Sequence, residues 1–289
     1  MEPVQQERPE GLFRLFDLLQ NPPPPVPCWI GSYLLPRNCI TVFGGHSKVG
    51  KTFIVFSFIE ALITGAPLFG YHGFPVEEAC RVLLIDRELG RNGIYDRTIQ
   101  TLGRFLHHPR LLQEYQEKIW CISRDTRVSL SSRDGIDMIR RSLDISGANV
   151  LILDPIGKLH YWDENSASEM NYLFESLDNL LREYKERGLS IILSHHFSKG
   201  PAPKSERGDP LSASNFRGSI RFHTDPDSVL TVVKTKMHWE EVDTDQEWSW
   251  WEIIIRASLR HGRELRDFQC TINEGKSMKV LFRGFRESD

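Results

Sequence analysis

Eight consecutive residues, Gly45–Thr52 (GHSKVGKT), match the pattern G-x-x-x-x-G-K-[ST] at every fixed position. The apolar segment Cys39–Phe43 precedes them and the helical pattern Thr52–Ile63 follows. In that context the glycines let successive backbone N–H groups converge on phosphate oxygens, and the helix N-terminus adds its positive end. Lys51 would reach the β- and γ-phosphates of ATP, and Thr52 would ligate Mg²⁺. The sequence therefore predicts a nucleotide site formed by Gly45, His46, Ser47, Lys48, Val49, Gly50, Lys51 and Thr52.

Carboxylates end two other apolar segments. Val150–Leu153 is followed by Asp154, which suits a carboxylate that positions Mg²⁺ and its waters. The segment Arg81–Ile85 is followed by Asp86 and, two residues later, Glu88. On a strand these two acids would share a face, and one of them could orient or deprotonate the water that attacks the γ-phosphate. We expect Glu88 to do so because it lies at or just past the strand end, with Asp86 as the alternative.

A fourth apolar segment, Ser190–Leu193, ends in two adjacent histidines, with Lys199 three residues further on. Half of a metal site, an acid–base pair and a sensor of a bound ligand are the three interpretations. On a strand, His195 and His196 would point to opposite faces, which makes a shared metal geometrically poor. The strand belongs to the same series as those that end in the phosphate loop, Glu88 and Asp154, so one histidine is expected near the γ-phosphate.

The elements that position these residues alternate between short apolar strands and helices. Helices are expected at Thr52–Ile63, Gly93–Leu106, Gly135–Leu143 and Ser168–Arg187, and a weaker strand at Lys118–Ser123. Such a pattern predicts an α/β fold with a mainly parallel central sheet covered by helices on both faces. After about residue 225 the segments Val229–Lys234, Trp248–Ala257 and Phe268–Ile272 predict an antiparallel β extension at the C-terminus.

The ordered set GGHSKVGKT, LLIDRELGRNGIYDR, LILDP, DENSASEM, LSHHFSK and FRGS resembles the RecA-like P-loop ATPases, and among them the RepA-type hexameric replicative helicases and AAA-type RecA-fold ATPases. The resemblance runs from about Trp29 to the last β segments. It implies that Glu88 activates water, Asp154 associates with the metal and His196 senses the γ-phosphate. It also implies that Arg217 reaches the phosphates of an adjacent subunit. Such ATPases are typically homo-oligomeric rings, often hexamers, with single-stranded DNA in the central channel.

The chain is expected to comprise an N-terminal arm, residues 1–27, and an ATPase domain, residues 28–289, whose last part, 225–289, is the antiparallel extension. Within the arm, Leu12, Leu15, Phe16 and Leu19 fall on one helical face of the segment Gly11–Leu19, followed by the stiff spacer Asn21–Pro27. Two arrangements are open for this helix: it packs on its own domain, or it docks on a neighbouring subunit. We interpret the arm as a possible oligomerisation element.

Two loops are candidates for contact with DNA. Residues 198–216 are polar and rich in Gly, Pro and Ser, with cations and acids that partly cancel. Residues 155–168 contain Lys158, His160, Tyr161 and Trp162, and the aromatic pair could stack on bases. Packing in the core is the more usual role for such aromatics. The Trp248, Trp250 and Trp251 cluster is expected to serve as core or interface.

The bulk composition limits these functions only weakly. With 289 residues and a net charge of −3, the chain has no global basic footprint, so any nucleic-acid contact must be local. Five scattered cysteines without a CxxC pair predict reduced thiols, and the absence of a signal peptide or membrane-length apolar run predicts a cytoplasmic protein without membrane contact. The predicted function is an Mg²⁺-dependent ATPase, a ring-forming helicase or replication/recombination motor. The alternative is a regulatory or signalling ATPase, or an ATP-gated assembly module, that acts on a protein.

Overall fold

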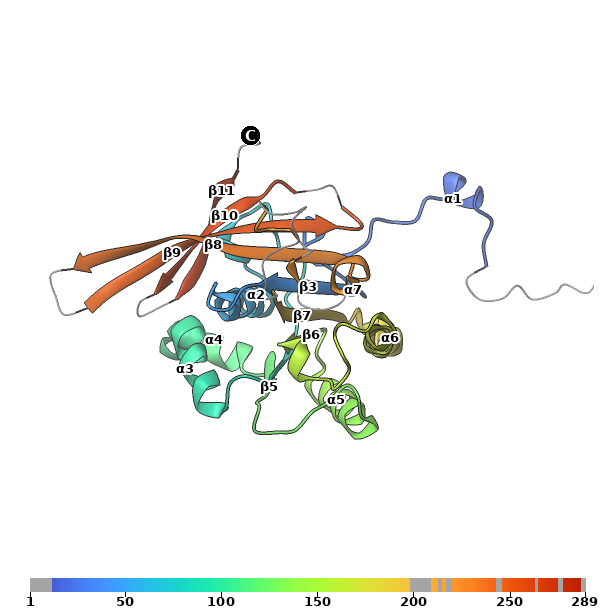
Figure 1. The fold of residues 1–289 in the computed structure, drawn as a ribbon, viewed down its shortest axis with the longest axis horizontal. Coiled ribbons are helices and arrows are strands. Elements are labelled where there is room, and N and C mark those ends of the chain that lie inside the picture. The colour runs from blue at the N-terminus through green and yellow to red at the C-terminus, as the bar shows by residue number, and fades with distance from the viewer. Residues whose placement is uncertain are drawn as a thin grey trace, which may run out of the picture.

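A nine-stranded sheet organises the molecule in the computed structural model, which describes residues 12–197, 209–212, 215–216, 220–242, 246–262, 265–274 and 278–286 (Figure 1). Across the sheet the strand order is β11-β10-β9-β8-β3-β7-β6-β4-β5. The strands are β3 (Ile40–Gly45), β4 (Val82–Asp86), β5 (Ile119–Ile122), β6 (Val150–Asp154), β7 (Ser190–His196), β8 (Ser228–Val242), β9 (Gln246–Leu259), β10 (Phe268–Glu274) and β11 (Lys279–Phe285).

The two halves of the sheet differ in strand direction. From β8 to β5 neighbouring strands are parallel, whereas the pairs β8–β9, β9–β10 and β10–β11 are antiparallel. The predicted α/β architecture with a C-terminal antiparallel extension is therefore confirmed. In the parallel half, β3 lies between β7 and β8, with Gly45 paired to both His196 and Val232. The carboxyl ends of β3, β7, β6 and β4 consequently share one edge of the sheet, where the chemistry-bearing residues lie.

Helices cover both faces of the parallel half, as Figure 1 shows, with α5 and α6 opposite α2. The helices are α1 (Asp17–Gln20), α2 (Lys51–Thr64), α3 (Arg91–Leu102), α4 (Pro109–Tyr115), α5 (Arg133–Ser146), α6 (Ala167–Glu183) and α7 (Arg221–Thr224). One buried cluster joins α2 to the antiparallel strands through residues such as Ile59 and Ile253. The other joins α5 and α6 to the sheet through residues such as Leu143 and Leu177. Burial of these apolar faces fixes the strands, and with them the residues at their ends.

Local sequence signals fix where α5 and α6 begin. The Ser132 hydroxyl caps α5 by accepting from Gly135 N (3.2 Å), and the Ser166 hydroxyl caps α6 by accepting from Glu169 N (3.3 Å). Glu169 in turn accepts from the backbone of Asp163 (2.8 Å), which ties the loop after β6 to the start of α6. These caps explain why both helices begin a residue or two before the predicted ranges Gly135–Leu143 and Ser168–Arg187.

The arm differs from the prediction. The expected helix Gly11–Leu19 is reduced to the four residues of α1, and within the described residues the whole predicted apolar face is exposed: Leu12, Leu15, Phe16 and Leu19. A segment this short gains too little from helix formation unless it packs against something. Figure 1 shows α1 standing away from the sheet at the end of the proline-rich spacer, so the described helix of the arm does not pack on the sheet of its own domain.

Other elements were not predicted. The small ribbon of β1 (Cys28–Ile30) and β2 (Leu35–Pro36), helix α4 and strand β11 all lack a strong apolar period in the sequence. Strands β8 and β9 are longer than predicted and form a ribbon that extends well beyond the sheet (Figure 1). In the described residues no helix is long and apolar enough to cross a membrane.

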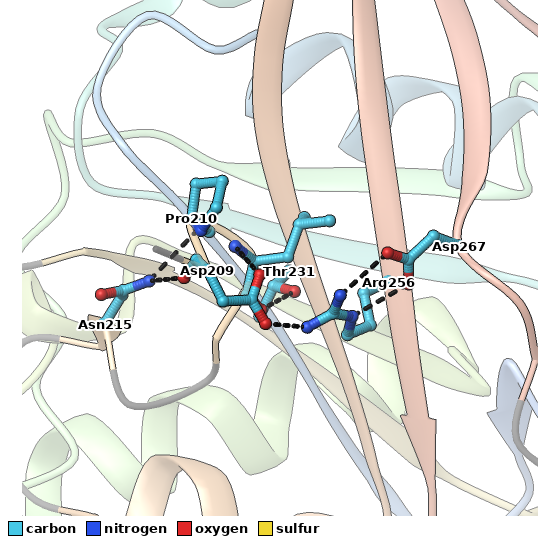
Figure 2. A network of polar contacts seen from close by, with 7 residues as sticks. Asp209, Pro210, Asn215, Thr231, Arg256 and Asp267 are labelled. Carbon is cyan, nitrogen blue, oxygen red and sulfur yellow. Dashed lines mark hydrogen bonds and ion pairs between the residues drawn. The ribbon is translucent and has the colours of Figure 1, made fainter. Parts of the chain in front are cut away.

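A polar network anchors the segment that leads into α7 to the antiparallel strands (Figure 2). The Arg256 guanidinium on β9 pairs with Asp209 and forms a two-pronged contact with Asp267, both bonds 2.9 Å long. The Thr231 hydroxyl on β8 donates to the Leu211 carbonyl (2.7 Å). Residues 209–211, which lie within the predicted loop 198–216, are thus held on the sheet next to β8.

Candidate nucleotide and ATPase site

The phosphate loop has the backbone geometry that the motif requires. Gly50 has φ +101°, and an added Cβ would lie 2.4 Å from Ile272 Cδ1, so both conformation and space require glycine there. At Gly45 an added Cβ would lie 2.8 Å from the Val232 carbonyl oxygen. His46, Ser47 and Lys48 are exposed between them, whereas Val49 is buried. The loop is therefore fixed at both ends and open in the middle.

Lys51 begins α2 and turns back into the loop. Its side chain is buried, and Nζ donates to the carbonyls of Gly45 and His46, both at 2.8 Å. Burial lowers the pKa of Lys51 to about 8, opposed by the charges of Asp154 and Glu88. The ammonium group thus lies inside the loop, where it can neutralise phosphate charge, and half-buried Thr52 follows it on the helix.

Trp251 supports the loop from the antiparallel half of the sheet, a role that the sequence did not reveal. Its indole Nε1 donates to the Val49 carbonyl (3.3 Å), and its ring meets Phe53 of α2 edge-on. The contact joins residues that are 202 positions apart, so no local pattern could have indicated it. Trp251 is buried, so the core role predicted for the tryptophan cluster is confirmed for this residue.

Asp154 ends β6 in a buried position beside the strands that carry the other acids. Burial, together with the carboxylates of Asp86 and Glu88, raises the pKa of Asp154 to about 6, while Ser194 and Lys51 oppose the shift. The charged form of Asp154 is thus unfavourable in this buried position, and a bound cation would stabilise it. The Thr52 hydroxyl and the Asp154 carboxylate are the hard oxygen donors that Mg²⁺ prefers, so these two residues fit the predicted metal site.

Asp86 and Glu88, the two alternatives for the water-directing acid, occupy different environments. Asp86 is buried, and its Oδ1 accepts from the backbone N–H groups of Glu88 (2.8 Å) and Leu89 (2.7 Å). Burial raises its pKa despite these two bonds. Glu88 lies past the strand end with its side chain partly exposed. Asp86 thus holds the turn after β4, and Glu88 is the more exposed of the two carboxylates, so its role as the water-directing acid stays a prediction.

Lys158 and His196 hold the Glu88 carboxylate. Its Oε1 accepts from Lys158 Nζ (2.9 Å) in the loop after β6, and lies 3.5 Å from His196 Nε2 at the end of β7. His196 first and Lys158 second lower the pKa of Glu88 to about 2, against the opposing effect of burial. A carboxylate with so low a pKa is a weak proton acceptor, so it suits orienting a water molecule better than deprotonating it.

The two histidines separate as strand geometry predicts. His196 is paired with Gly45 across β3 and β7, so the residue next to Glu88 also borders the phosphate loop. His195 points to the opposite face of β7 and is buried there. Its ring centroid lies 4.1 Å from that of Phe222, and its ring stacks on Phe216. The structure therefore brings His196, and not His195, to the predicted site.

A pocket of about 320 Å³ lies beside this site, between the loop after β6 and the end of β7, and is lined by both histidines, Lys158, His160 and Trp162. The two aromatics of the predicted stacking pair differ. Tyr161 is exposed, and its hydroxyl accepts from Arg127 Nη2 (2.9 Å). Trp162 is partly buried against the core cluster and the His160 ring. Tyr161 alone is available to a partner.

Some predicted residues cannot be placed. Arg217 and Lys199 lie outside the described residues, as does loop 198–208, so their roles remain predictions. Lys158 was named in the sequence only as part of the candidate DNA-contact loop 155–168. Its bond to Glu88 depends on the sheet order, in which β6 lies next to β4.

A phosphate loop between β3 and α2, with carboxylates at the ends of the parallel strands, defines a P-loop ATPase with a RecA-like fold. A sequence-family model described as an AAA domain matches residues 5–202, well over half of the chain, and the protein belongs to that family.

One solved structure similar to this chain is a KaiC-like protein from the hyperthermophilic archaeon Pyrococcus horikoshii OT3. The two share 15% sequence identity, the match covers 91% of this chain and all of the other, and the TM-score is 0.52. At this identity the likeness concerns the fold alone, and it agrees with the RecA-like architecture. No curated protein matches the sequence.

The contacts of Glu88 give a prediction about its ionisation. Replacing His196 with alanine is expected to raise the pKa of Glu88 from about 2 toward its ordinary value of 4.5, measured by NMR titration of the side-chain carboxyl. Because the folded-state pKa is depressed, this group stabilises the fold above pH 4.5, and the contribution is lost as the pH falls through about 2. The exposed Lys185→Ala serves as the control, and an unshifted Glu88 in His196→Ala would contradict the assignment.

Proposed function

We propose that this protein is a ring-forming, ATP-hydrolysing motor that acts on DNA, of the kind found among RepA-type replicative helicases. The observation that carries the proposal is the contact of Glu88 with Lys158 and His196. One partner belongs to the loop after β6 and the other ends β7, immediately before loop 198–208. A change at the γ-phosphate that moved Glu88 would therefore reach both loops that are candidates for DNA contact.

Each step of hydrolysis has a residue suited to it. Lys51 and the loop N–H groups bind the phosphates, and Glu88 orients the water. When bound through Thr52 and Asp154, Mg²⁺ supplies further neutralisation of the phosphate charge. His196 holds Glu88 in place. In the proposed ring, Arg217 of an adjacent subunit completes the site.

The surface near the site supports a nucleic-acid partner. Three exposed arginines lie nearby: Arg91 follows β4, and Arg124 and Arg127 follow β5. Arg127 contacts the exposed Tyr161. Arg124 also donates to the Glu88 carbonyl (3.0 Å), so this group adjoins the ATPase site. Cations beside an exposed aromatic ring suit the phosphates and bases of single-stranded DNA.

The proposal is tested by measuring ATP turnover with and without single-stranded DNA, beside Lys51→Ala. Turnover that rises with DNA, and that rises less in Tyr161→Ala than in Tyr172→Ala, is the expected result. Tyr172 is a matched control because it is equally an exposed tyrosine, on α6. Absence of hydrolysis would refute the motor. Hydrolysis that is indifferent to DNA would favour the alternative, a regulatory ATPase with a protein partner, which the net charge of −3 also suits.

The arm gives a prediction about assembly. Its apolar side chains are exposed at the end of a stiff spacer, an arrangement that suits docking on a second copy of the chain. The double variant Leu15→Ser, Phe16→Ser is expected to form smaller oligomers than the unaltered protein in ATP, as measured by light scattering after size exclusion. Ile145→Ser, an exposed apolar residue of the domain, is the control. Equal oligomer sizes in all three proteins would exclude the arm from assembly.

A further inference from the structure

Three side chains of different chemistry meet at the end of the sheet opposite to the ATPase site. Cys39 lies immediately before β3, Asp227 immediately before β8, and His261 shortly after β9. One ligand atom from each, a thiol sulfur, a carboxylate oxygen and a ring nitrogen, all lie within 4.8 Å of one another. Strand β3 has six residues and separates this cluster from the phosphate loop by about 20 Å.

We propose that Cys39, Asp227 and His261 bind a zinc ion. Sulfur, nitrogen and carboxylate oxygen together are the donor set of zinc, and three protein ligands with a fourth position for water form a known zinc geometry. His261 Nε2 and Asp227 Oδ1 are 3.2 Å apart. Two donors bound to one tetrahedral zinc ion are separated by about 3.3 Å. Those two ligands are therefore already spaced for a shared ion.

The surroundings hold Asp227 in position. Its Oδ2 accepts from the backbone N–H of Ile40 (3.0 Å), which leaves Oδ1 directed toward His261. Its own backbone is paired on both sides, with N donating to the Ile40 carbonyl (2.9 Å) and O accepting from Arg260 N (2.8 Å). Such outer contacts orient a metal ligand before the ion arrives.

Arg260 competes with a metal ion for Asp227, since its Nη1 lies 3.5 Å from Asp227 Oδ1. However, its Nη2 donates to the carbonyls of Thr224 (2.6 Å) and Asp225 (3.0 Å), so the guanidinium has other acceptors. The region can therefore accommodate a divalent cation beside Arg260.

The state of Cys39 argues against a different use of the cluster. Burial, reinforced by Asp227, raises the pKa of the Cys39 thiol to about 12. A thiol of that kind is neither a nucleophile nor a redox centre at neutral pH. It becomes a thiolate ligand when a metal displaces its proton. A bound ion would join the starts of β3 and β8 to the end of β9, at the junction between the parallel and antiparallel halves of the sheet.

The test uses the full chain without nucleotide, so that the Mg²⁺ site does not contribute. After equilibration with zinc and removal of the free metal, one zinc ion per chain is expected by elemental analysis, together with a higher Tm than in chelator. Cobalt in place of zinc is expected to show a thiolate charge-transfer band. Cys39→Ser and His261→Gln are expected to weaken zinc binding by more than about 100-fold, because even outer-shell changes cost 10- to 100-fold.

Matched variants control for nonspecific effects. Cys80→Ser removes another buried thiol and His223→Gln another exposed imidazole, and both are expected to retain one zinc ion. Because His261 is partly exposed, His261→Gln should fold even if Cys39→Ser does not. The proposal is overturned if the unaltered protein retains no zinc, if His261→Gln binds as tightly as His223→Gln, or if the cobalt complex lacks the thiolate band. A simple hydrogen-bonded Cys–Asp–His cluster would give those results.

Discussion

ATP turnover is expected to fall by at least about 100-fold when Lys51 is replaced with alanine, because the variant loses a cation aimed at the charge that develops on the transferred phosphate. Nζ lies within the loop, in contact with the Gly45 and His46 carbonyls. Nucleotide affinity should fall as well, since the ground-state phosphates lose the same partner. Phosphate release at saturating ATP and binding of a fluorescent nucleotide separate the two effects.

The Lys51→Ala protein should remain folded. Burial lowers the pKa of Lys51 to about 8, so the charged side chain destabilises the nucleotide-free fold below that pH, and the penalty disappears as the pH rises through 10.5. The Tm of Lys51→Ala at neutral pH is therefore expected to equal or exceed that of the unaltered protein. The exposed Lys185→Ala should change neither Tm nor turnover. Normal turnover in Lys51→Ala would mean that ATP binds elsewhere on the chain.

Replacing Glu88 with glutamine is expected to separate binding from hydrolysis. Glutamine keeps the shape and an oxygen that can accept from Lys158, but it loses the negative charge that orients the water. Turnover should fall by about 100- to 10,000-fold while nucleotide affinity stays within a few fold. Rapid separation of the complex followed by chromatography should recover bound ATP from Glu88→Gln, where the unaltered protein yields ADP.

Two comparisons sharpen the test at Glu88. Glu117→Gln removes an exposed glutamate outside the site and should leave hydrolysis unchanged. Asp86→Ala should instead destabilise the fold by about 1–3 kcal/mol, because two backbone N–H groups lose their acceptor at a buried position. If Glu88→Gln hydrolyses ATP normally, the water is directed by another group, and the contact with His196 serves only the structure.

The structure could be predicted from the sequence where a chemical motif and the pattern of a strand or helix occur in the same segment. The motif at Gly45–Thr52 and the apolar strands before Asp86, Asp154 and His196 each contain their own evidence, so both the parallel core and the candidate residues at its edge could be predicted. The opposite faces of His195 and His196 followed from the alternation of side chains along a strand.

The contacts that could not be predicted depend on which strands are neighbours in the sheet. The bond from Trp251 to the phosphate loop, the Lys158–Glu88 pair and the Cys39–Asp227–His261 cluster each join distant segments that meet only after the sheet has formed. The N-terminal helix failed for a different reason. Its apolar side chains Leu12, Leu15, Phe16 and Leu19 are exposed, with no partner among the described residues, and a short helix without packing does not persist.

The position of β8 has a consequence for where the protein may be divided. The family match ends at residue 202, after the phosphate loop, Glu88, Asp154 and His196, yet β8 and Trp251 lie beyond it and flank the phosphate loop directly. A fragment ending there would expose the N–H and C=O groups along one side of β3, inviting self-association through that edge. The segment that the family model matches is thus shorter than the sheet of which it is part, and truncations should begin from the arm rather than from the C-terminal strands.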